Sequence, residues 1–413
     1  MNEIFIQAKK AARSLVTSDG NKRNEVLLRL ASLLRENSER VLAANALDLE
    51  KMDRSNPLYD RLLLNATRID GIASDTAAVA SLPDPVGRLI SSTVRPNGLR
   101  IKRVSVPFGV VGVIFESRPN VAYDVFSLCF KSGNACILKG SKDAENSNIV
   151  ALELMRHALS DCGFDPCCVS LMPSTHEAVG ELFGAVGMVD LVIPRGGRRL
   201  IDFVRDNSRV PCIETGAGVV HAYFDESADL EMGRGIVTNA KTRRVSVCNA
   251  LDCLIVNEKR LADLPALLEG VRAKEVELFC DYQAFSALEG KYPSHLLHTA
   301  DEQSFGTEFM ALKMAVKTVP GIQEALDHIA RFGSGHSESI ITSDENSARR
   351  FRAEVDAACV YVNAPTSFSD GAQFGLGAEI GISTQKLGPR GPMGLEELTT
   401  YKWLIDGEGQ LRP

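Results

Sequence analysis

The amino-acid sequence predicts an α/β protein with two parallel-sheet domains and a small β arm. Two observations carry this prediction. From Pro107 onward, short apolar runs alternate with helical stretches, a pattern typical of a parallel sheet with helices on both faces, as in dinucleotide-binding domains. A second series of the same kind begins at Leu251. We find no internal repeat and no flexible linker, so we expect the two domains to pack together.

The chain is expected to begin with helices and to continue into the arm. Leu27, Leu30, Ala31 and Leu34 recur at the spacing that gives a helix one buried face, and residues 2–82 are predicted to be mostly helical. Residues 92–106 then place apolar side chains between polar ones on both sides of a Pro-Asn-Gly turn. This pattern indicates a two-stranded arm, which also carries basic residues.

The strands and helices of the two series follow from the same patterns. In the first series, strands are expected at Val110–Phe115, Ala135–Lys139, Val169–Met172, Val189–Pro194, Pro211–Glu214 and Val219–Phe224, with helices near 121–132, 143–160, 174–185 and 197–206. In the second series, strands are expected at Leu251–Val256, Ala315–Val319, Ser339–Thr342 and Ala358–Val362. The run Thr399–Ile405 predicts a further strand near the end of the chain, which could pair with the arm.

The composition argues against two classes of protein, those that bind nucleic acid and those that span a membrane. The 413 residues carry 46 Lys and Arg against 53 Asp and Glu, a net charge of −7, which argues against a nucleic-acid partner. No apolar run reaches the roughly 18–20 residues of a membrane span, and the first residues lack the centre of a signal peptide. We therefore expect a soluble cytoplasmic protein without a membrane partner.

Cysteine and histidine spacing offers no metal motif. The ten cysteines contain no CxxC pair, and the seven histidines contain no HExxH, so we assign neither a metal nor a disulfide framework. His328 and His336 flank a glycine turn, where they could contact a ligand or serve in packing and capping.

Two local features point to chemistry. Cys248 lies in a polar stretch before an apolar strand, where Lys241, Arg243 and Arg244 could favour the nucleophilic thiolate; the alternative is an ordinary half-buried cysteine. The Pro194–Gly197 segment follows an apolar strand and precedes a helix. Its glycines, Gly196 and Gly197, would let the backbone approach a pyrophosphate or a nicotinamide, although they also suit a tight turn, and no GxGxxG motif accompanies them.

Five stretches together resemble a known family. They are Val113–Val121, Leu128–Gly140, Ile193–Gly197, Asn239–Asn249, and Phe374–Leu387 with Arg390–Gly394. In these stretches the chain resembles the gamma-glutamyl phosphate reductases (glutamate-5-semialdehyde dehydrogenases) of the aldehyde dehydrogenase superfamily. The resemblance implies an aldehyde dehydrogenase-like fold with two Rossmann-like domains. It implies an NADP(H)-binding domain at 1–91 and 107–214, a catalytic domain at 215–394, and an oligomerisation arm at 92–106 and 395–413.

The resemblance also implies a reaction. NADPH-dependent reduction of L-glutamyl 5-phosphate would yield L-glutamate 5-semialdehyde and phosphate through a thioester on Cys248, the second step of proline biosynthesis from glutamate. Both tetrahedral species carry an oxyanion that needs fixed donors. Asn120 matches the family's side-chain donor and the backbone N–H of Cys248 would be the second. Asn120 could equally be a helix N-cap, and the two roles could coexist.

Cofactor contacts are implied at two places. Lys139 matches a lysine placed against the adenosine ribose, and Ser141 with Lys142 suits a 2′-phosphate, which favours NADPH over NAD. Glu308 and Phe309 resemble the pair that holds the nicotinamide ribose. For the substrate anion, Arg118, Arg195 and Arg390 remain alternatives.

Some features leave a second activity open. Glu214 precedes Cys248 by about the interval of the general base in hydrolytic aldehyde dehydrogenases; we expect a minor role for it. Val245, Pro365, Ser367 and Gly388-Pro389 depart from the family pattern. The rival functions are a semialdehyde dehydrogenase that uses water or coenzyme A and a catalytically silent scaffold. The expected partners are glutamate kinase, which would supply the acyl phosphate, and further copies of the chain in a homodimer or a dimer of dimers.

Overall fold

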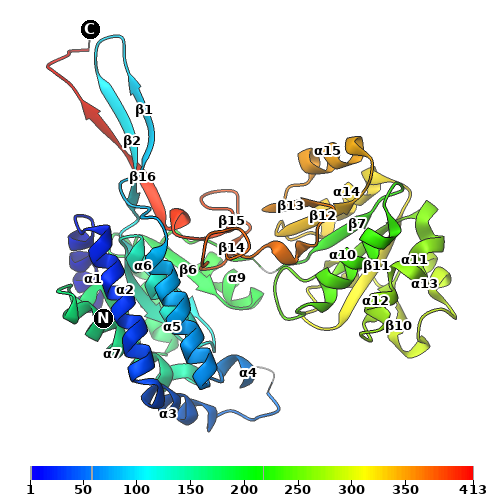
Figure 1. The fold of residues 1–413 in the computed structure, drawn as a ribbon, viewed down its shortest axis with the longest axis horizontal. Coiled ribbons are helices and arrows are strands. Elements are labelled where there is room, and N and C mark those ends of the chain that lie inside the picture. Colours follow the sequence, from blue (N-terminus) through cyan, green and yellow to red (C-terminus); the bar gives the residue numbers. More distant parts are fainter. Residues whose placement is uncertain (1, 57–58, 217, 413) are drawn as a thin grey trace. The chain divides into compact units, whose positions relative to one another are not determined.

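The computed structural model describes residues 2–56, 59–216 and 218–412, and these divide into two compact units (Figure 1). Unit 1 comprises Met1–Thr215, Gly375–Gly381 and Met393–Pro413. Unit 2 comprises Gly216–Phe374 and Ile382–Pro392. Unit 1 is therefore assembled from three separate stretches of sequence.

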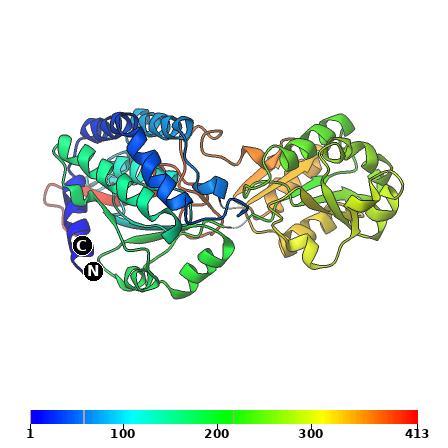
Figure 2. The same cartoon turned by 90° about the horizontal axis from the view of Figure 1, so that it is seen from below.

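A four-stranded parallel sheet forms the centre of unit 1. Its strands run in the order β5-β4-β3-β6 (Val169–Leu171, Ala135–Lys139, Val110–Phe115, Leu191–Arg195). Every residue of β3 and β4 is buried, which explains why both strands are almost entirely apolar. Figure 2 shows helices on both faces of this sheet. These strands confirm the predicted α/β fold of the first series.

Helices account for most of the remainder of unit 1. They are α1 (Asn2–Leu15), α2 (Gly20–Glu36), α3 (Ser38–Leu49), α4 (Tyr59–Leu62), α5 (Ala66–Ser81), α6 (Asn120–Lys131), α7 (Glu145–Asp161), α8 (His176–Gly184) and α9 (Arg198–Asn207). The predicted apolar face of α2 is buried at Leu27, Leu30 and Leu34. The carboxylate of Asp48 is buried and accepts hydrogen bonds from the backbone N–H groups of Asn146 and Ser147, which satisfies donors at the start of α7.

The arm is a three-stranded antiparallel sheet in the order β1-β2-β16 (Leu89–Val94, Arg100–Pro107, Thr399–Asp406). Strand β16 pairs with β2 along its whole length, from Thr399 opposite Pro107 to Asp406 opposite Arg100. The expected pairing of the Thr399–Ile405 strand with the arm is therefore confirmed. All six residues of β1 are exposed, and both edge strands present large apolar side chains to solvent.

Unit 2 contains a seven-stranded sheet in the order β10-β9-β11-β8-β7-β12-β13. The strands are β7 (His221–Phe224), β8 (Cys253–Asn257), β9 (Glu277–Cys280), β10 (Leu297–Thr299), β11 (Lys313–Val319), β12 (Ser337–Ile341) and β13 (Cys359–Val362). The helices are α10 (Leu230–Thr242), α11 (Leu264–Leu267), α12 (Glu269–Arg272), α13 (Tyr282–Leu288), α14 (Ile322–Phe332) and α15 (Glu345–Glu354), and a two-stranded ribbon joins β14 (Ile382–Ser383) to β15 (Gly391–Pro392). The short strands β9 and β10 were not predicted.

Two predicted strands require correction. The expected strand Pro211–Glu214 forms only a single bridge, between Val192 and Cys212, before the chain passes into unit 2. The expected strand Val219–Phe224 is shortened to β7 and belongs to the second sheet, where it pairs with β8 and β12. A run that is apolar except for His221 fits any buried parallel strand, so its pattern does not identify its partners.

Two further observations concern the described part of the chain as a whole. None of its helices combines the length and apolar character needed to cross a membrane. None of the ten cysteines, all of which lie in the described ranges, forms a disulfide.

Candidate active site

Cys248 lies in unit 2, half-buried on the loop between α10 and β8. The backbone N–H of Ala250 donates to the carbonyl of Val247, which makes a tight turn around the thiol residue. Gly218 packs directly against this turn, because a Cβ atom at that position would overlap the carbonyl group of Cys248. The backbone at Cys248 is thus tightly packed against the backbone at Gly218.

Asn249, the residue after Cys248, holds the loop in place through hydrogen bonds. The buried side chain of Asn249 donates to the carbonyl of Ser369 at 2.9 Å, and Thr366 Oγ1 donates to the carbonyl of Asn249 at 2.9 Å. Ser367 Oγ donates to Asn239 Oδ1 at 2.8 Å. Ser367, a departure from the family pattern, is therefore buried and bound to helix α10, which leads into the Cys248 loop.

A buried ion pair lies next to this loop. Lys241 Nζ lies 3.8 Å from Asp252 Oδ1, and both side chains are almost fully buried. Burial raises the pKa of Asp252 to about 7, while the neighbouring Lys241 ammonium opposes this shift. Lys241, which the sequence offered as a cation near the thiol, is thus paired with Asp252, whereas Arg243 and Arg244 are exposed.

The predicted pair Glu308 and Phe309 is attached to the same loop region. Glu308 Oε1 accepts a hydrogen bond from the backbone N–H of Gly218 at 3.2 Å. The backbone N–H of Phe309 donates to Asp252 Oδ1 at 3.0 Å, and the Phe309 ring centre lies 6.0 Å from Lys241 Nζ. Unit 2 therefore brings Glu308 and Phe309 together with the Cys248 loop through Gly218 and Asp252, two residues that sequence reasoning missed.

Asn120 lies in unit 1 as the first residue of α6. The N-cap of this helix is Pro119, so the alternative that Asn120 caps the helix is wrong. Instead, Asn120 Nδ2 donates to Asp124 Oδ2 at 3.0 Å, one helical turn away. Burial raises the pKa of Asp124 to about 6, and the hydrogen bond from Asn120 opposes this rise. One N–H of the Asn120 amide is thereby oriented, and the amide carries a second.

The remaining predicted cofactor residues gather at one edge of the sheet in unit 1. Strands β3, β4 and β6 are parallel neighbours, so their carboxyl ends meet there, the edge at which such sheets bind ligands. Lys139 ends β4 and is followed by Ser141 and the exposed Lys142. Burial lowers the pKa of Lys139. Gly196 and Gly197 follow β6 at the same edge.

Glu116 and Ser117, which directly follow β3, contact the segments that follow β6 and β4. Glu116 Oε2 accepts from the backbone N–H of Gly197 at 3.0 Å, and a Cβ atom at Gly196 would overlap the Glu116 carboxylate. Ser117 Oγ donates to Asp143 Oδ2 at 2.6 Å and lies 3.5 Å from Ser141 Oγ. Glu116 and Ser117 belong to the Val113–Val121 stretch but were given no role from the sequence, although their position directly after a buried strand could have indicated one.

Glu214 and two of the candidate arginines have defined surroundings. Glu214 is half-buried in unit 1, with one carboxylate oxygen 3.7 Å from Arg205 Nη1. In unit 1 the charge of Arg195 lowers the pKa of Asp124, which opposes the effect of burial. In unit 2 Arg390 forms an ion pair with Asp356 at 2.8 Å and donates to the Asp356 carbonyl.

Comparisons with known proteins agree with one another. A family model described as the aldehyde dehydrogenase family matches residues 1–278. Proteins named gamma-glutamyl phosphate reductase from Pelodictyon phaeoclathratiforme and Parabacteroides distasonis are 55% and 54% identical to this chain. Those alignments cover 99% and 100% of this chain and 98% and 99% of the relatives. A crystal structure of gamma-glutamyl phosphate reductase from Thermotoga maritima is 41% identical, covers 100% of this chain and 99% of that one, and has a TM-score of 0.96.

Proposed function

Because the chain belongs to the gamma-glutamyl phosphate reductases of the aldehyde dehydrogenase family, we propose that it reduces L-glutamyl 5-phosphate to L-glutamate 5-semialdehyde and phosphate, with NADPH as the reductant, in proline biosynthesis. The observation that supports this best is the Cys248 loop. It presents a half-buried thiol on a backbone fixed by Gly218 and by the contacts of Asn249. A thiol presented in this way suits acyl transfer.

We infer that Cys248 is the nucleophile. Its thiolate attacks the acyl carbon, the bond from that carbon to the phosphate oxygen breaks, and phosphate leaves behind a thioester. After reduction, the carbon–sulfur bond of the thiohemiacetal breaks, which releases the aldehyde and regenerates the thiolate. The backbone N–H of Cys248 and the amide of Asn120 are proposed as the donors that stabilise the oxyanions of both tetrahedral species.

The residues at the edge of the unit 1 sheet fit a dinucleotide phosphate. Lys139, Ser141 and Lys142 supply two cations and a hydroxyl for the ribose and its 2′-phosphate. Gly196 and Gly197 are proposed to meet the pyrophosphate through their backbone once the Glu116 carboxylate leaves the Gly197 N–H. In unit 2, Glu308 and Phe309 are proposed to hold the nicotinamide ribose. When bound, NADPH supplies the hydride that reduces the thioester.

The test of this function is the reverse reaction. Glutamate semialdehyde, phosphate and NADP⁺ are supplied to the purified enzyme, and NADPH is followed by its absorbance. We expect NADPH formation that requires phosphate, because phosphate must attack the thioester for the cycle to close. NADPH formation without phosphate would overturn the proposal in favour of a hydrolytic dehydrogenase, and no turnover under either condition would exclude both.

The exposed arm supports a further part of the proposal. Its edge strands β1 and β16 carry exposed apolar side chains, among them Val94, Trp403 and Ile405. Exposed strand edges invite pairing with another chain. We propose that the arm joins copies of this chain in a homodimer or a dimer of dimers. The acyl phosphate is too reactive to be stored and is proposed to come from a separate glutamate kinase.

Cofactor choice gives one prediction. Replacing Lys142 by glutamate is expected to lower kcat/KM for NADPH roughly 10- to 100-fold, because a carboxylate repels the 2′-phosphate and a charge-assisted hydrogen bond is lost. The value for NADH is expected to change much less. Steady-state kinetics with both cofactors measures the ratio of kcat/KM for NADPH to kcat/KM for NADH. Lys51→Glu makes the same charge change at another exposed lysine of unit 1 and is expected to preserve the ratio. An unchanged ratio in Lys142→Glu would remove Lys142 from the cofactor site.

Glu214 gives a second prediction. A phosphate reductase needs a thioester that resists water, so a general base for hydrolysis is not required. Glu214→Gln, which keeps the shape of the side chain, is therefore expected to lower the phosphate-dependent rate by less than about tenfold, far less than loss of a nucleophile. The reverse assay measures this. If the folded variant were as inactive as one lacking Cys248, Glu214 would be an essential base.

A further inference from the structure

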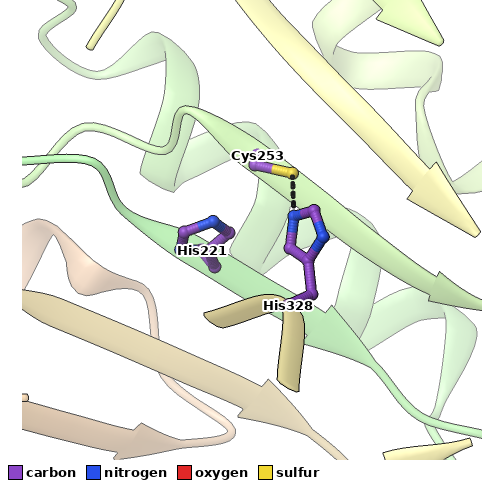
Figure 3. Close-up of side chains that lie close together, drawn as sticks. All are labelled: His221, Cys253 and His328. Carbon is purple, nitrogen blue, oxygen red and sulfur yellow. Dashed lines mark hydrogen bonds between the residues drawn. The ribbon is translucent and has the colours of Figure 1, made fainter. Parts of the chain in front are cut away.

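Three potential metal ligands come together in the interior of unit 2: His221, Cys253 and His328 (Figure 3). One ligand atom from each lies within 4.8 Å of the other two. His221 and Cys253 are register partners in the parallel strands β7 and β8, so their side chains project from the same face of the sheet. His328 reaches them from α14. Because more than thirty residues separate each ligand from the next in the sequence, no spacing motif reveals the group.

The distances suit a small tetrahedral ion. Cys253 Sγ lies 3.7 Å from His328 Nε2. Bonds of about 2.3 Å to sulfur and 2.0–2.1 Å to nitrogen place the two ligand atoms of a tetrahedral zinc site about 3.5 Å apart. Sulfur and imidazole nitrogen are also the ligands that select such an ion over calcium or magnesium. Small side-chain shifts would therefore complete the site.

A fourth residue orients one of the ligands. Glu338 lies beside His221 in the register of β12 and β7; its Oε2 accepts a hydrogen bond from the His221 backbone N–H at 2.9 Å and lies 3.0 Å from His221 Nδ1. This carboxylate assigns the proton of the ring to Nδ1 and leaves Nε2 as the nitrogen with a free lone pair. Metal-binding histidines are held by carboxylates in the same way.

The cluster contains a polar atom that the rest of the described chain does not satisfy. His221 is fully buried, and its Nε2 has no hydrogen-bond partner among the described residues. Apart from Glu338 the cluster has apolar neighbours, since Cys253 belongs to a core cluster with Tyr223 and Ile255. Leaving such an atom unpartnered in an apolar core is costly, and a bound ion is one of the groups that accounts for it.

We propose that His221, Cys253 and His328 form a binding site for a thiophilic divalent metal ion such as Zn²⁺, through Cys253 Sγ and the Nε2 atoms of both histidines. On binding, the Cys253 thiol releases its proton to water and a sulfur–metal bond replaces the sulfur–hydrogen bond. The two positive charges of the ion are then balanced by the Cys253 thiolate and the Glu338 carboxylate. Three protein ligands leave one tetrahedral position for a water molecule.

The test uses Co²⁺, whose thiolate complexes absorb light, with the metal-free full chain carrying Cys248→Ala to remove the thiol of the candidate active site. We expect one equivalent of Co²⁺ to produce a thiolate-to-cobalt charge-transfer band and the visible bands of a tetrahedral ion. Zn²⁺ should displace it. Adding Cys253→Ala should abolish the charge-transfer band, whereas Cys280→Ala, which removes another fully buried thiol of the same sheet, should retain it.

A second variant keeps the proposal testable if Cys253→Ala does not fold. Glu338→Gln preserves the shape of the orienting side chain and is expected to weaken Co²⁺ binding by about 10- to 100-fold. No charge-transfer band in the Cys248→Ala chain, a band of equal strength in its Cys253→Ala derivative, or unchanged affinity in Glu338→Gln would each overturn the site. None of these readouts depends on catalysis, so they are independent of the proposed function.

Discussion

Replacing Cys248 by alanine is expected to lower the rate of reduction by on the order of 10⁴-fold or more, because no other group can carry the acyl intermediate. The change removes one sulfur atom from a half-buried loop position. The hydrogen bonds that hold this loop come from Asn249, Thr366 and the backbone, so they remain in the variant. We therefore expect the melting temperature to change little while activity is lost.

The measurement is the phosphate-dependent reverse reaction with wild type and variant at equal concentration. Cys162→Ala removes another half-buried thiol, at the end of α7, and is the matched control, expected to keep wild-type activity. Mass spectrometry of wild type mixed with substrate should detect an acyl group on Cys248 in the absence of reductant. A Cys248→Ala protein that retained a tenth of the wild-type rate would exclude the thioester route.

Replacing Asn120 by alanine is expected to lower kcat about 10²- to 10³-fold, the usual loss when one oxyanion donor is removed. The effect should appear in kcat more than in KM, because the oxyanion is present in the tetrahedral species and its transition states but not in the bound substrate. Stability is expected to fall as well, because Asp124 loses the hydrogen bond from Asn120 and becomes a half-buried carboxyl without that partner.

Asp124→Asn separates the two roles of Asn120. This variant keeps the donor amide of Asn120 and an acceptor oxygen next to it, so a loss of less than about tenfold in kcat is expected. Thermal unfolding of both variants controls for loss of fold. Equal losses of kcat in Asn120→Ala and Asp124→Asn would mean that Asn120 acts only through helix α6, and an unchanged kcat in Asn120→Ala would remove it from the oxyanion site.

The sequence predicted most strands of the two sheets because an apolar run is a local signal, whereas the role of Cys248 stays a prediction. Apolar runs such as Val110–Phe115 became strands that are buried at every residue. The assignment of Val219–Phe224 to the first series was wrong, because a mostly apolar strand fits either sheet. The sequence also offered Lys241 as a cation near the thiol, whereas only the fold shows that Asp252 pairs with it.

Residues whose role depends on tertiary contacts could not be recognised from sequence patterns. Gly218 matters because the carbonyl of Cys248, thirty positions later in the chain, occupies the space of its missing Cβ. The Asn120 side chain is held by Asp124 rather than capping its helix, a difference of one position that a sequence pattern does not resolve. The His221, Cys253 and His328 cluster likewise arises only when β7, β8 and α14 pack together.

The three-part composition of unit 1 has a consequence during synthesis on the ribosome. Strand β2 emerges early, but its partner β16 is translated only after the whole stretch Gly216–Pro392. Strand β2 ends at Pro107 and β16 begins at Thr399, so at about 5–20 residues per second that delay lasts roughly 15 to 60 s. Gly216–Phe374, the main part of unit 2, can meanwhile fold without waiting for later sequence. The nascent arm therefore spends this interval with an unpaired strand edge, and ribosomes translating one message hold several such edges close together.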